Sequence, residues 1–403
     1  MISVKAAIKE ILTQTMVLGA ERQSLEQSRG RFLAEPVVAD SDLPPFDRSQ
    51  MDGYALRAED VHSVPAQLRI VGESAAGRGW HKELKQGQAV RIMTGAPVPA
   101  GADSVQKVEL TREIEKDRLV EILETVAHGR SIVRRGSEIK KGQTVLTPGM
   151  KIDAAAIAVL ASFGYSEVLV RRQPRVSVLA TGSELVPVDQ KPGRDQIRDS
   201  NNHSLRAYAE SAGAVVDLVT HANDDTAALQ RHIEIAAERS DAVVTSGGVS
   251  MGVYDFTKLA LKKLNAEIFF EKVALRPGKP TVFARLPNGT LVFGLPGNPV
   301  SVAVTFNLFA RPALLAMQGA NQTSLDQKLA ILGHSAHGSV DRESYIPAQL
   351  LTDKSGQLIA EPLKWGGSSD FVSFARATVL INLPAGDPVN EAGAVVRIIH
   401  LPT

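Results

Sequence analysis

The chain has 403 residues, of which 44% are hydrophobic and 22% are charged, and its formal net charge is +1. Several domains are expected because one hydrophobic core rarely serves a chain of this length, and the near-neutral charge does not indicate a nucleic-acid binder. Cysteine is absent, which excludes disulfides, Cys-ligated zinc, iron–sulfur clusters and thiol nucleophiles.

The spacing of the histidines limits the kinds of metal site that are possible, and the lengths of the apolar runs bear on whether a segment could span a membrane. The nine histidines show no H-x-x-x-H or H-E-x-x-H spacing, so a protein-held metal should be a hard cation on carboxylates. Lys5, Lys9 and Glu10 interrupt the first apolar pattern, which argues against a signal peptide. The longest apolar run identified, residues 154–163, is far shorter than the roughly 20 residues that span a bilayer. We therefore expect a cytoplasmic protein with no membrane contact and no nucleic-acid partner.

The N-terminal part combines helical periodicity with a polar loop. Apolar residues at helical spacing predict one or two helices within residues 1–30. Residues 42–56 read DLPPFDRSQMDGYAL, where the two prolines force an extended entry and Asp52-Gly53 predicts a turn. The dense polarity of this stretch fits either a solvated loop or a loop that faces a ligand.

Residues 55–137 indicate a mostly β insert, with short apolar runs between Gly and Pro clusters. Thr94 ends one run, and it either offers a hydroxyl and an amide to an anion or makes a turn. Residues 113–126 fit helix and strand equally. The run RRGSE, which ends at Glu138, is either a solvated face or an anion contact with a partner carboxylate. A helix over 154–163 follows, with Asp153 as N-cap and Gly164 as its end.

From about residue 173 the pattern alternates strand and helix, which predicts a parallel sheet covered by helices. Strands are expected at 176–180, 215–219, 242–245 and 291–295, with a helix over 300–315 after the last. In such a sheet the carboxyl ends of the strands share one edge, where ligands bind. Acids and glycines follow these strands: Glu184, Asp224, Gly247, Gly248, Asp255, Gly297 and Asn298.

Residues 241–255, DAVVTSGGVSMGVYD, are the centre of this pattern. A buried strand breaks at Ser246-Gly247-Gly248 into a loop that closes on Asp255, where paired glycines allow close backbone approach and an anion nest. Carboxylates at this edge would hold Mg²⁺, while glycine amides, Arg276 and Lys279 would bind phosphate or another oxyanion. Each acid alone is equally explained as a helix cap or a surface charge, and only the convergence favours a site.

Residues 326–403 indicate a separate small β domain, with apolar runs at 329–332, 379–383 and 394–399. The stretch GGSSD at 366–370 is either a hairpin loop or a ligand contact, and its composition favours the loop.

Seven motifs occur in order: PPFDRSQMDGYA, RIMTGAPVP, RRGSE, TGSEL, VTSGGVSMGVYD, RPGKP and GLPGNPVS. From about Asp42 to Arg311 this ordered set resembles molybdopterin molybdotransferase, the MoeA family that includes the E domain of gephyrin. The resemblance implies an α/β multidomain fold and a homodimer of elongated subunits. It divides the chain into 1–54 (N-terminal helices and part of an elongated linker domain), 55–137 (β-rich insert), 138–172 (return of the linker), 173–325 (α/β domain resembling molybdopterin adenylyltransferase) and 326–403 (C-terminal barrel-like β domain).

The resemblance also implies an activity in molybdenum cofactor biosynthesis. Such a transferase, or molybdenum insertase, takes adenylylated molybdopterin and molybdate, cleaves the adenylate with the help of Mg²⁺, and releases AMP. Molybdopterin adenylyltransferase would be the upstream partner. The site would lie between the α/β domain and the partner subunit.

Matching the family motifs residue by residue gives a set of expected site residues. This chain has Ser-Glu at 137–138 where Glu-Asp is familiar, and arginine at 276 where lysine is also seen. The expected catalytic residues are Asp52, Glu138, Glu184, Asp224, Asp255, Lys272, Arg276 and Lys279, of which Glu184, Asp224 and Asp255 would hold the metal. The expected substrate-binding residues are Thr94, Ser246, Gly247, Gly248, Pro296, Gly297, Asn298, Pro299, Arg342 and Ser369.

Two other functions fit parts of the pattern. The first is adenylylation of molybdopterin with ATP, although the flanking parts, 1–172 and 326–403, exceed what one α/β domain would need. The second is a binding scaffold without turnover, as in the receptor-binding role of gephyrin, although the acids Asp52, Glu184, Asp224 and Asp255 are intact. Molybdate is a tetrahedral dianion, and adenylate cleavage is phosphoryl chemistry, so amides and basic side chains suit the insertion of molybdate into adenylylated molybdopterin.

Overall fold

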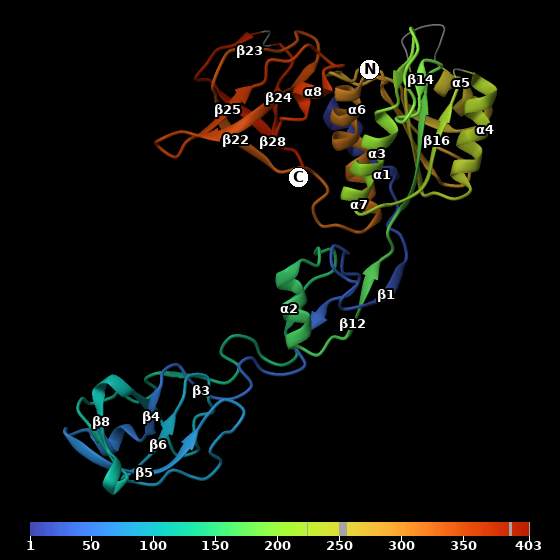
Figure 1. Cartoon of the computed structure of the whole chain (residues 1–403). Helices are drawn as coiled ribbons and strands as arrows, with labels where there is room; N and C mark the ends of the chain where they lie inside the picture. Colours follow the sequence, from blue (N-terminus) through green and yellow to red (C-terminus); the bar gives the residue numbers. More distant parts are fainter. Residues whose placement is uncertain (224, 250–255, 387–388, 403) are drawn as a thin grey trace. The chain divides into compact units, whose positions relative to one another are not determined.

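A computed structural model describes residues 1–223, 225–249, 256–386 and 389–402 (Figure 1). The chain forms two compact units. The larger unit consists of Met1–Ala34, Pro148–Asp153 and Glu167–Thr403, and the smaller unit of Glu35–Thr147 and Ala154–Ser166. Each has its own hydrophobic core, and the two are described separately below.

The centre of the larger unit is a six-stranded sheet in the order β16-β13-β17-β21-β20-β18. Its strands are β13 (Arg175–Thr181), β16 (Val215–Ala222), β17 (Ala242–Ser246), β18 (Glu267–Phe270), β20 (Val282–Arg285) and β21 (Leu291–Leu295). The first four in sheet order are parallel, as predicted. The expectation of a purely parallel sheet is wrong at β20, which is antiparallel to both its neighbours. A tight turn from Leu286 to Thr290 joins it directly to β21 and leaves no room for a crossover.

Both faces of this sheet are covered, which explains why strands such as β17 and β21 are buried at every residue. One face packs against a cluster that includes Ile11, Leu205 and Phe309, and the other against a cluster that includes Ile233 and Leu261. The helices are α1 (Val4–Gln14), α3 (Asn201–Ser211), α6 (Pro299–Thr305) and α7 (Arg311–Met317) on the first face, and α4 (Thr226–Ala237) and α5 (Phe256–Lys263) on the second (Figure 1).

Helix α6 continues through a π-helical turn, η4 (Phe306–Ala310), into α7, so that Pro299–Met317 is one helical segment. Among the described residues it is the one helix long and apolar enough to cross a membrane by length and composition, and 89% of its most apolar window is buried in the protein. This helix is longer than the apolar run at 154–163, but Ser301, Thr305, Asn307 and Arg311 interrupt its apolar residues. The segment is apolar because it lies in the core, where Phe306 and Leu314 are fully buried.

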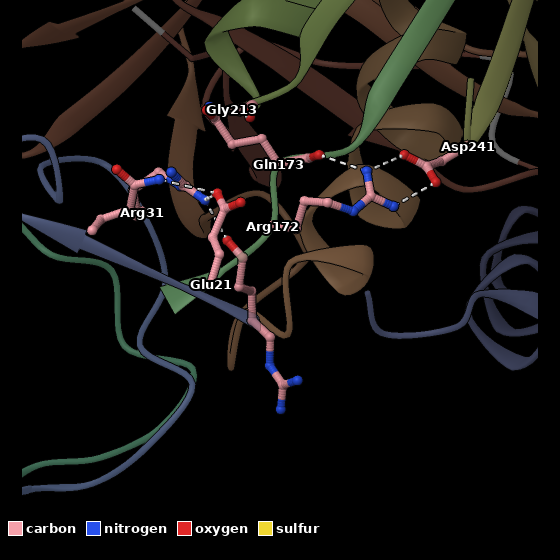
Figure 2. A network of polar contacts seen from close by, with 8 residues as sticks. Glu21, Arg31, Arg172, Gln173, Gly213 and Asp241 are labelled. Atoms are coloured by element: carbon pink, nitrogen blue, oxygen red, sulfur yellow. Dashed lines mark hydrogen bonds and ion pairs between the residues drawn. The ribbon is translucent and has the colours of Figure 1, made fainter. Parts of the chain in front are cut away.

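The N-terminal prediction is half right. Helix α1 forms with Ser3 as N-cap, but β1 (Ala20–Ser24) is a strand that pairs antiparallel with β12 (Glu167–Arg171). Polar contacts fix the ends of this pair, as Figure 2 shows. Arg31 Nη2 donates to Glu21 Oε1 at 2.6 Å, and Arg172 donates to both carboxylate oxygens of Asp241 at 2.9 and 2.8 Å.

The smaller unit is built on a six-stranded sheet in the order β7-β4-β6-β5-β9-β8. The ambiguous residues 113–126 form the end of β8, a 3-10 turn and β9. Apolar side chains such as Leu56 and Val90 fill its two core clusters. Its elements are β2 (Val37–Val38), β3 (Arg48–Ser49), β4 (Gly53–Leu56), η1 (Ala58–Val61), β5 (Ala66–Ser74), β6 (Gln88–Ile92), β7 (Ser104–Lys107), η2 (Val108–Leu110), β8 (Thr111–Ile114), η3 (Glu115–Asp117), β9 (Leu119–Ile122), β10 (Ile132–Val133), β11 (Thr144–Leu146) and α2 (Ala154–Ser162).

The C-terminal strands close a barrel within the larger unit, because β24 pairs with β26 as well as β25. A two-residue strand from the α/β region, β19, adds parallel to β24 and thereby places Arg276 beside Ser344. The barrel elements are β22 (Gln327–Leu332), β24 (Glu343–Thr352), β25 (Leu358–Pro362), β26 (Val379–Leu383) and β28 (Val395–His400). The short elements of the larger unit are β14 (Leu185–Val186), β15 (Ile197–Arg198), β19 (Leu275–Arg276), β23 (Ala336–His337), α8 (Phe371–Phe374) and β27 (Val389–Asn390).

Candidate functional site

A cavity of about 880 Å³ opens at the carboxyl edge of the central sheet. Segments that follow three parallel strands line it, each directly after its strand: Gly182 and Glu184 after β13, residues 247–249 after β17 and residues 296–299 after β21. The predicted residues on its wall are Glu184, Gly247, Gly248, Pro296, Gly297, Asn298, Pro299 and Ser369. The expected convergence at one edge is thus present for these residues. Asp224 and Asp255 lie outside the described residues.

The two glycines after β17 have positive φ angles, and at Gly247 a side chain would also clash with a neighbouring residue. Gly247 has φ of +87°, and a Cβ there would lie 2.5 Å from the carbonyl oxygen of Thr181. Its N–H donates to the Leu295 carbonyl at 3.1 Å, so this amide is already satisfied and is not free for the expected anion nest. Ser246 is buried at the end of β17 and does not line the cavity, and its Oγ has no hydrogen-bond partner.

The Pro296–Pro299 loop is held from two sides. Asn201 Nδ2 donates to the Gly297 carbonyl at 2.7 Å, and Asn298 Nδ2 donates to Ser368 Oγ at 2.7 Å. Pro299 is the first residue of α6, a position that suits proline because its missing N–H needs no partner there. The loop is therefore fixed between helix α3 and residues 366–370.

Residues 366–370 lead into the short helix α8 and place exposed Ser369 on the cavity wall. Asp370 organises the turn, because its carboxylate accepts from the N–H groups of Gly366 at 2.8 Å and Ser373 at 3.0 Å. These hydrogen bonds, with that of Gly366 the strongest, hold the pKa of Asp370 below its ordinary value. The favoured loop interpretation fits, although this loop does not join a hairpin.

Carboxylate oxygens on this wall are of the kind that bind Mg²⁺. Glu184 is exposed at the end of β13, and its carboxylate folds back toward Gly182. Asp199 lines the same cavity and accepts from the N–H and Nδ2 of Asn202 at 3.1 and 2.6 Å. Within the part of the chain that the structure describes, no cluster of three His, Cys, Asp or Glu could hold a metal, and two of the three predicted ligands lie outside it. The oxygen donors present fit a hard cation.

A second cavity, of about 800 Å³, shares Pro280, Pro296 and Asn298 with the first. Its wall carries four basic side chains, Arg276, Lys279, Arg342 and Lys364. This charge suits an anionic ligand.

Three of the predicted basic residues differ in their contacts. Arg276 Nη1 donates to the Gly338 carbonyl at 3.3 Å, and Arg342 Nε donates to Asp341 at 3.2 Å. Lys272 is exposed and lines neither cavity, and its carbonyl accepts from the N–H of Ile2 at 3.1 Å. The structure therefore groups Arg276 and Arg342 but leaves Lys272 apart.

Asp52, Thr94 and Glu138 belong to the smaller unit. Asp52 Oδ1 accepts from the N–H of Thr94 at 2.7 Å and from its hydroxyl at 3.1 Å, so these two predicted residues form one exposed group. Glu138 pairs with Arg48 at 3.2 Å. The structure thus joins the MDGYA and TGAPVP motifs.

The two arginines of RRGSE are tied to the loop that precedes MDGYA. Arg134 Nη1 donates to Asp47 at 2.6 Å, and Arg135 Nε donates to Asp42 at 2.7 Å. Burial works to raise the pKa of Asp47, but the N–H of Arg135 and the guanidinium of Arg134 outweigh it and hold that pKa below its ordinary value. Of the two interpretations of this motif, a contact between arginine and carboxylate is present.

Sequence reasoning did not identify Asn201 and Asp199 as residues of the site. Ser200 occupies the N-cap position of α3, and Asn201 lies in its first turn with its amide on the Gly297 carbonyl. The signal was the run Asp-Ser-Asn before a helix that begins at the ligand-binding edge of the sheet. Phe371, half-exposed in α8, also lines the cavity and carried no sequence signal.

Comparison with known proteins gives full-length matches. Family profiles match the MoeA N-terminal region (domain I and II) at residues 2–164, a probable molybdopterin binding domain at 177–316, and the MoeA C-terminal region (domain IV) at 330–401. The chain is 36% identical to the molybdopterin molybdenumtransferase of Staphylococcus epidermidis and 37% to that of Staphylococcus aureus, covering 99% of this chain and 95% of each relative. The crystal structure of the molybdopterin biosynthesis MoeA protein from Pyrococcus horikoshii OT3 is similar, with a TM-score of 0.86, 28% identity and 100% coverage of both chains.

Proposed function

Because this chain belongs to the MoeA family and is a molybdopterin molybdenumtransferase of molybdenum cofactor biosynthesis, we propose that it acts on adenylylated molybdopterin and molybdate and releases AMP. The observation that carries this proposal is the pair of joined cavities at the carboxyl edge of the central sheet. One has a glycine-loop wall, and the other is lined by basic side chains.

The two cavities supply complementary chemistry. The first has a volume of about 880 Å³, which lies in the range of small-molecule sites, and its backbone turns allow close approach. The second offers Arg276, Lys279 and Arg342 to phosphate or molybdate oxygens. Adenylate cleavage depends mostly on positioning and charge neutralisation, and these residues would supply both.

Magnesium belongs to this proposal. Glu184 would hold the cation together with Asp224 and Asp255, and Asp199 would stand beside them. When bound, Mg²⁺ would neutralise charge on the phosphate oxygens. The wall residues Asn201 and Asn298 keep the Pro296–Pro299 loop in place around the substrate.

We also propose that the protein acts as a homodimer in which Asp52, Thr94 and Glu138 of one subunit serve the site of its partner, as the family resemblance implies. Their exposure supports this arrangement, because they are accessible to another chain. An enzyme that adenylylates molybdopterin would supply the substrate. The cytoplasmic location stays a prediction from the sequence.

The decisive assay follows AMP release by purified protein from adenylylated molybdopterin, with and without molybdate and Mg²⁺. We expect molybdate-dependent release that Lys279→Ala reduces and Lys354→Ala, an exposed lysine outside both cavities, does not. Consumption of ATP to make the adenylylated pterin would instead identify an adenylyltransferase. Tight pterin binding without turnover would identify a scaffold.

A further inference from the structure

A third cavity, of about 730 Å³, shares no lining residue with the two site cavities. Residues 29–32 and 149–151 form one wall, Arg311 at the start of α7 forms another, and Asp326 and His400 of the barrel region complete it. All of these residues belong to the larger unit.

Buried nitrogen atoms without hydrogen-bond partners gather at this cavity. Among the described residues, the buried side-chain nitrogens that lack a partner are Arg31 Nε, Arg311 Nε, Arg311 Nη1 and His400 Nε2. All belong to residues that line this one cavity, whereas the other unpartnered buried atoms are oxygens. Residues from three separate chain segments thus bring nitrogens without partners to the wall of one cavity, and each buried arginine N–H among them costs free energy unless an acceptor reaches it.

Arg311 is the centre of this group. Burial lowers the pKa of its guanidinium, and the negative charge of Asp326 opposes that shift only in part. Among the described residues, Arg311 forms no ion pair within 4.0 Å. Arg311 is partly buried and the charge of Asp326 offsets its burial only in part, so an anion in the cavity would lower the free-energy cost of burying this guanidinium.

The remaining charges on the wall leave the cavity positive. Arg29 and Lys151 are exposed there, and Arg31 keeps its Nε free while its Nη2 bonds Glu21 (Figure 2). The carboxylates on the wall are Glu210 and Asp326. Glu210 is paired with Arg206 at 2.8 Å, and Asp326 accepts from Gln322 Nε2 at 2.7 Å.

We propose that this cavity binds a tetrahedral oxyanion of the phosphate class, either free or as the terminal group of a small phosphate ester. Guanidinium groups bind such oxygens through directed, charge-assisted hydrogen bonds, and a buried arginine is suited to this role. A lone phosphate would fill only part of about 730 Å³, so an ester is expected to bind more tightly. This site is separate from the proposed active site and does not rest on the proposed function.

The test measures binding of inorganic phosphate and of ribose 5-phosphate by calorimetry, at constant ionic strength set with chloride. Wild-type protein should show one binding event that depends on Arg311, and it should melt at a higher temperature with ligand. Arg311→Met should weaken binding at least about 10-fold, as expected for loss of a charge-assisted contact. Arg231→Met, which removes an exposed arginine of α4, should leave binding unchanged. Lys279→Ala should also leave this binding unchanged, which separates it from any binding at the proposed active site.

Stability without ligand gives a second readout. Arg311→Met should melt at or above the temperature of the wild type, because the substitution removes a partly buried charge that forms no ion pair within 4.0 Å among the described residues. Marked destabilisation of this variant without ligand would show that Arg311 already has an internal partner and would overturn the proposal. Binding of phosphate and ester that is indifferent to Arg311→Met would overturn it as well. Tighter binding of the ester than of phosphate would identify the ester as the ligand class, and equal binding would identify the free anion.

Discussion

At the scale of single residues, the contact between Asp52 and Thr94 allows a charge role to be separated from a structural one. Asp52→Ala removes the acceptor for both Thr94 hydrogen bonds, whereas Asp52→Asn keeps an acceptor oxygen and removes the charge. If the carboxylate acts in the reaction, both variants should lose about 10²-fold or more in kcat, which is the usual contribution of a catalytic acid or base.

The control for this prediction is Asp60→Ala, because Asp60 also caps a turn of the smaller unit by accepting from the Gly87 N–H at 2.9 Å. Its AMP release should match that of the wild type. Full activity in Asp52→Asn, with loss only in Asp52→Ala, would mean that Asp52 merely positions Thr94. Steady-state AMP release and the melting temperature of each variant decide between the two.

Residue identities at the site could be predicted only in part. The glycines after β17 and the Pro-Gly-Asn-Pro loop followed from strand-and-turn patterns, since those patterns are local in the chain. Asn201 was missed because its contact, the Gly297 carbonyl, is 96 positions away. Lys272 was expected at the site from the resemblance, but its side chain lines neither cavity.

At the scale of elements, the loop after β17 depends on glycine for two reasons that can be measured apart. Gly247 and Gly289 have similar φ angles of +87° and +92°, but a Cβ meets the Thr181 carbonyl only at Gly247. Gly289→Ala should therefore lose only about 1 kcal/mol from its strained backbone. Gly247→Ala should lose a further 1–3 kcal/mol, roughly the cost of overpacking, and should weaken pterin binding.

Denaturant unfolding of both variants gives the two free energies. Equal losses would show that the loop after β17 relaxes without cost and that steric approach to Thr181 is unimportant.

The turn at residues 366–370 is expected to depend on the charge of Asp370. Its pKa in the folded protein lies below the ordinary value of 3.8, so the stabilising contacts are fully present above that value. They are lost as the pH falls through the lower folded pKa. The amide chemical shifts of Gly366 and Ser373 should therefore titrate together with a midpoint below 3.8. A midpoint at or above 3.8 would contradict this assignment.

Asp370→Asn should abolish that titration, while Asp353→Asn, which changes a similar turn in the barrel, should leave it in place. In the proposed reaction, Asp370→Ala should raise the KM more than it lowers kcat, because the residue shapes the cavity wall without touching reacting atoms.

Helices and strands could be predicted where the pattern of apolar residues within a single chain segment was enough to define them. The strands β17 and β21 and the helix over 154–162 matched closely because continuous apolar runs define them. Strand β1 was read as helix because its partner, β12, lies about 150 positions later and no local pattern reveals that pairing. The antiparallel direction of β20 was missed because a five-residue turn joins it to β21, in place of the helical crossovers that link the parallel strands.

At the scale of the whole molecule, the order of the motifs gave the family, and the family profiles cover nearly the full chain. The residues of the C-terminal part alone predicted a small β domain, and only the family resemblance implied a barrel. Closure of the barrel depends on the pairing of β24 with β26, which are separated by β25 and α8. Its link to the site through β19 is two residues long and has no sequence signature. What the sequence could not supply was therefore long-range pairing, while the chemistry of the site came from local motifs.

The homodimer proposal makes a prediction that only a shared site satisfies. Asp52 belongs to the smaller unit and Glu184 to the larger. In a shared site these two residues would come from different subunits, so Asp52→Ala and Glu184→Ala each inactivate the part that a different subunit supplies. When two differently tagged variants are co-expressed and the mixed dimer is purified, one of its two sites receives an intact Asp52 from one chain and an intact Glu184 from the other. That dimer should show about half of the wild-type AMP release, since one of two symmetric sites is complete.

A mixed dimer of Glu184→Ala with Lys279→Ala should stay inactive, because both changes lie in the larger unit and each site then carries one of them. No activity in the first dimer would mean that each chain completes its own site and that dimerisation serves another purpose. Activity in the second dimer would mean that Glu184 and Lys279 of one chain do not serve the same site.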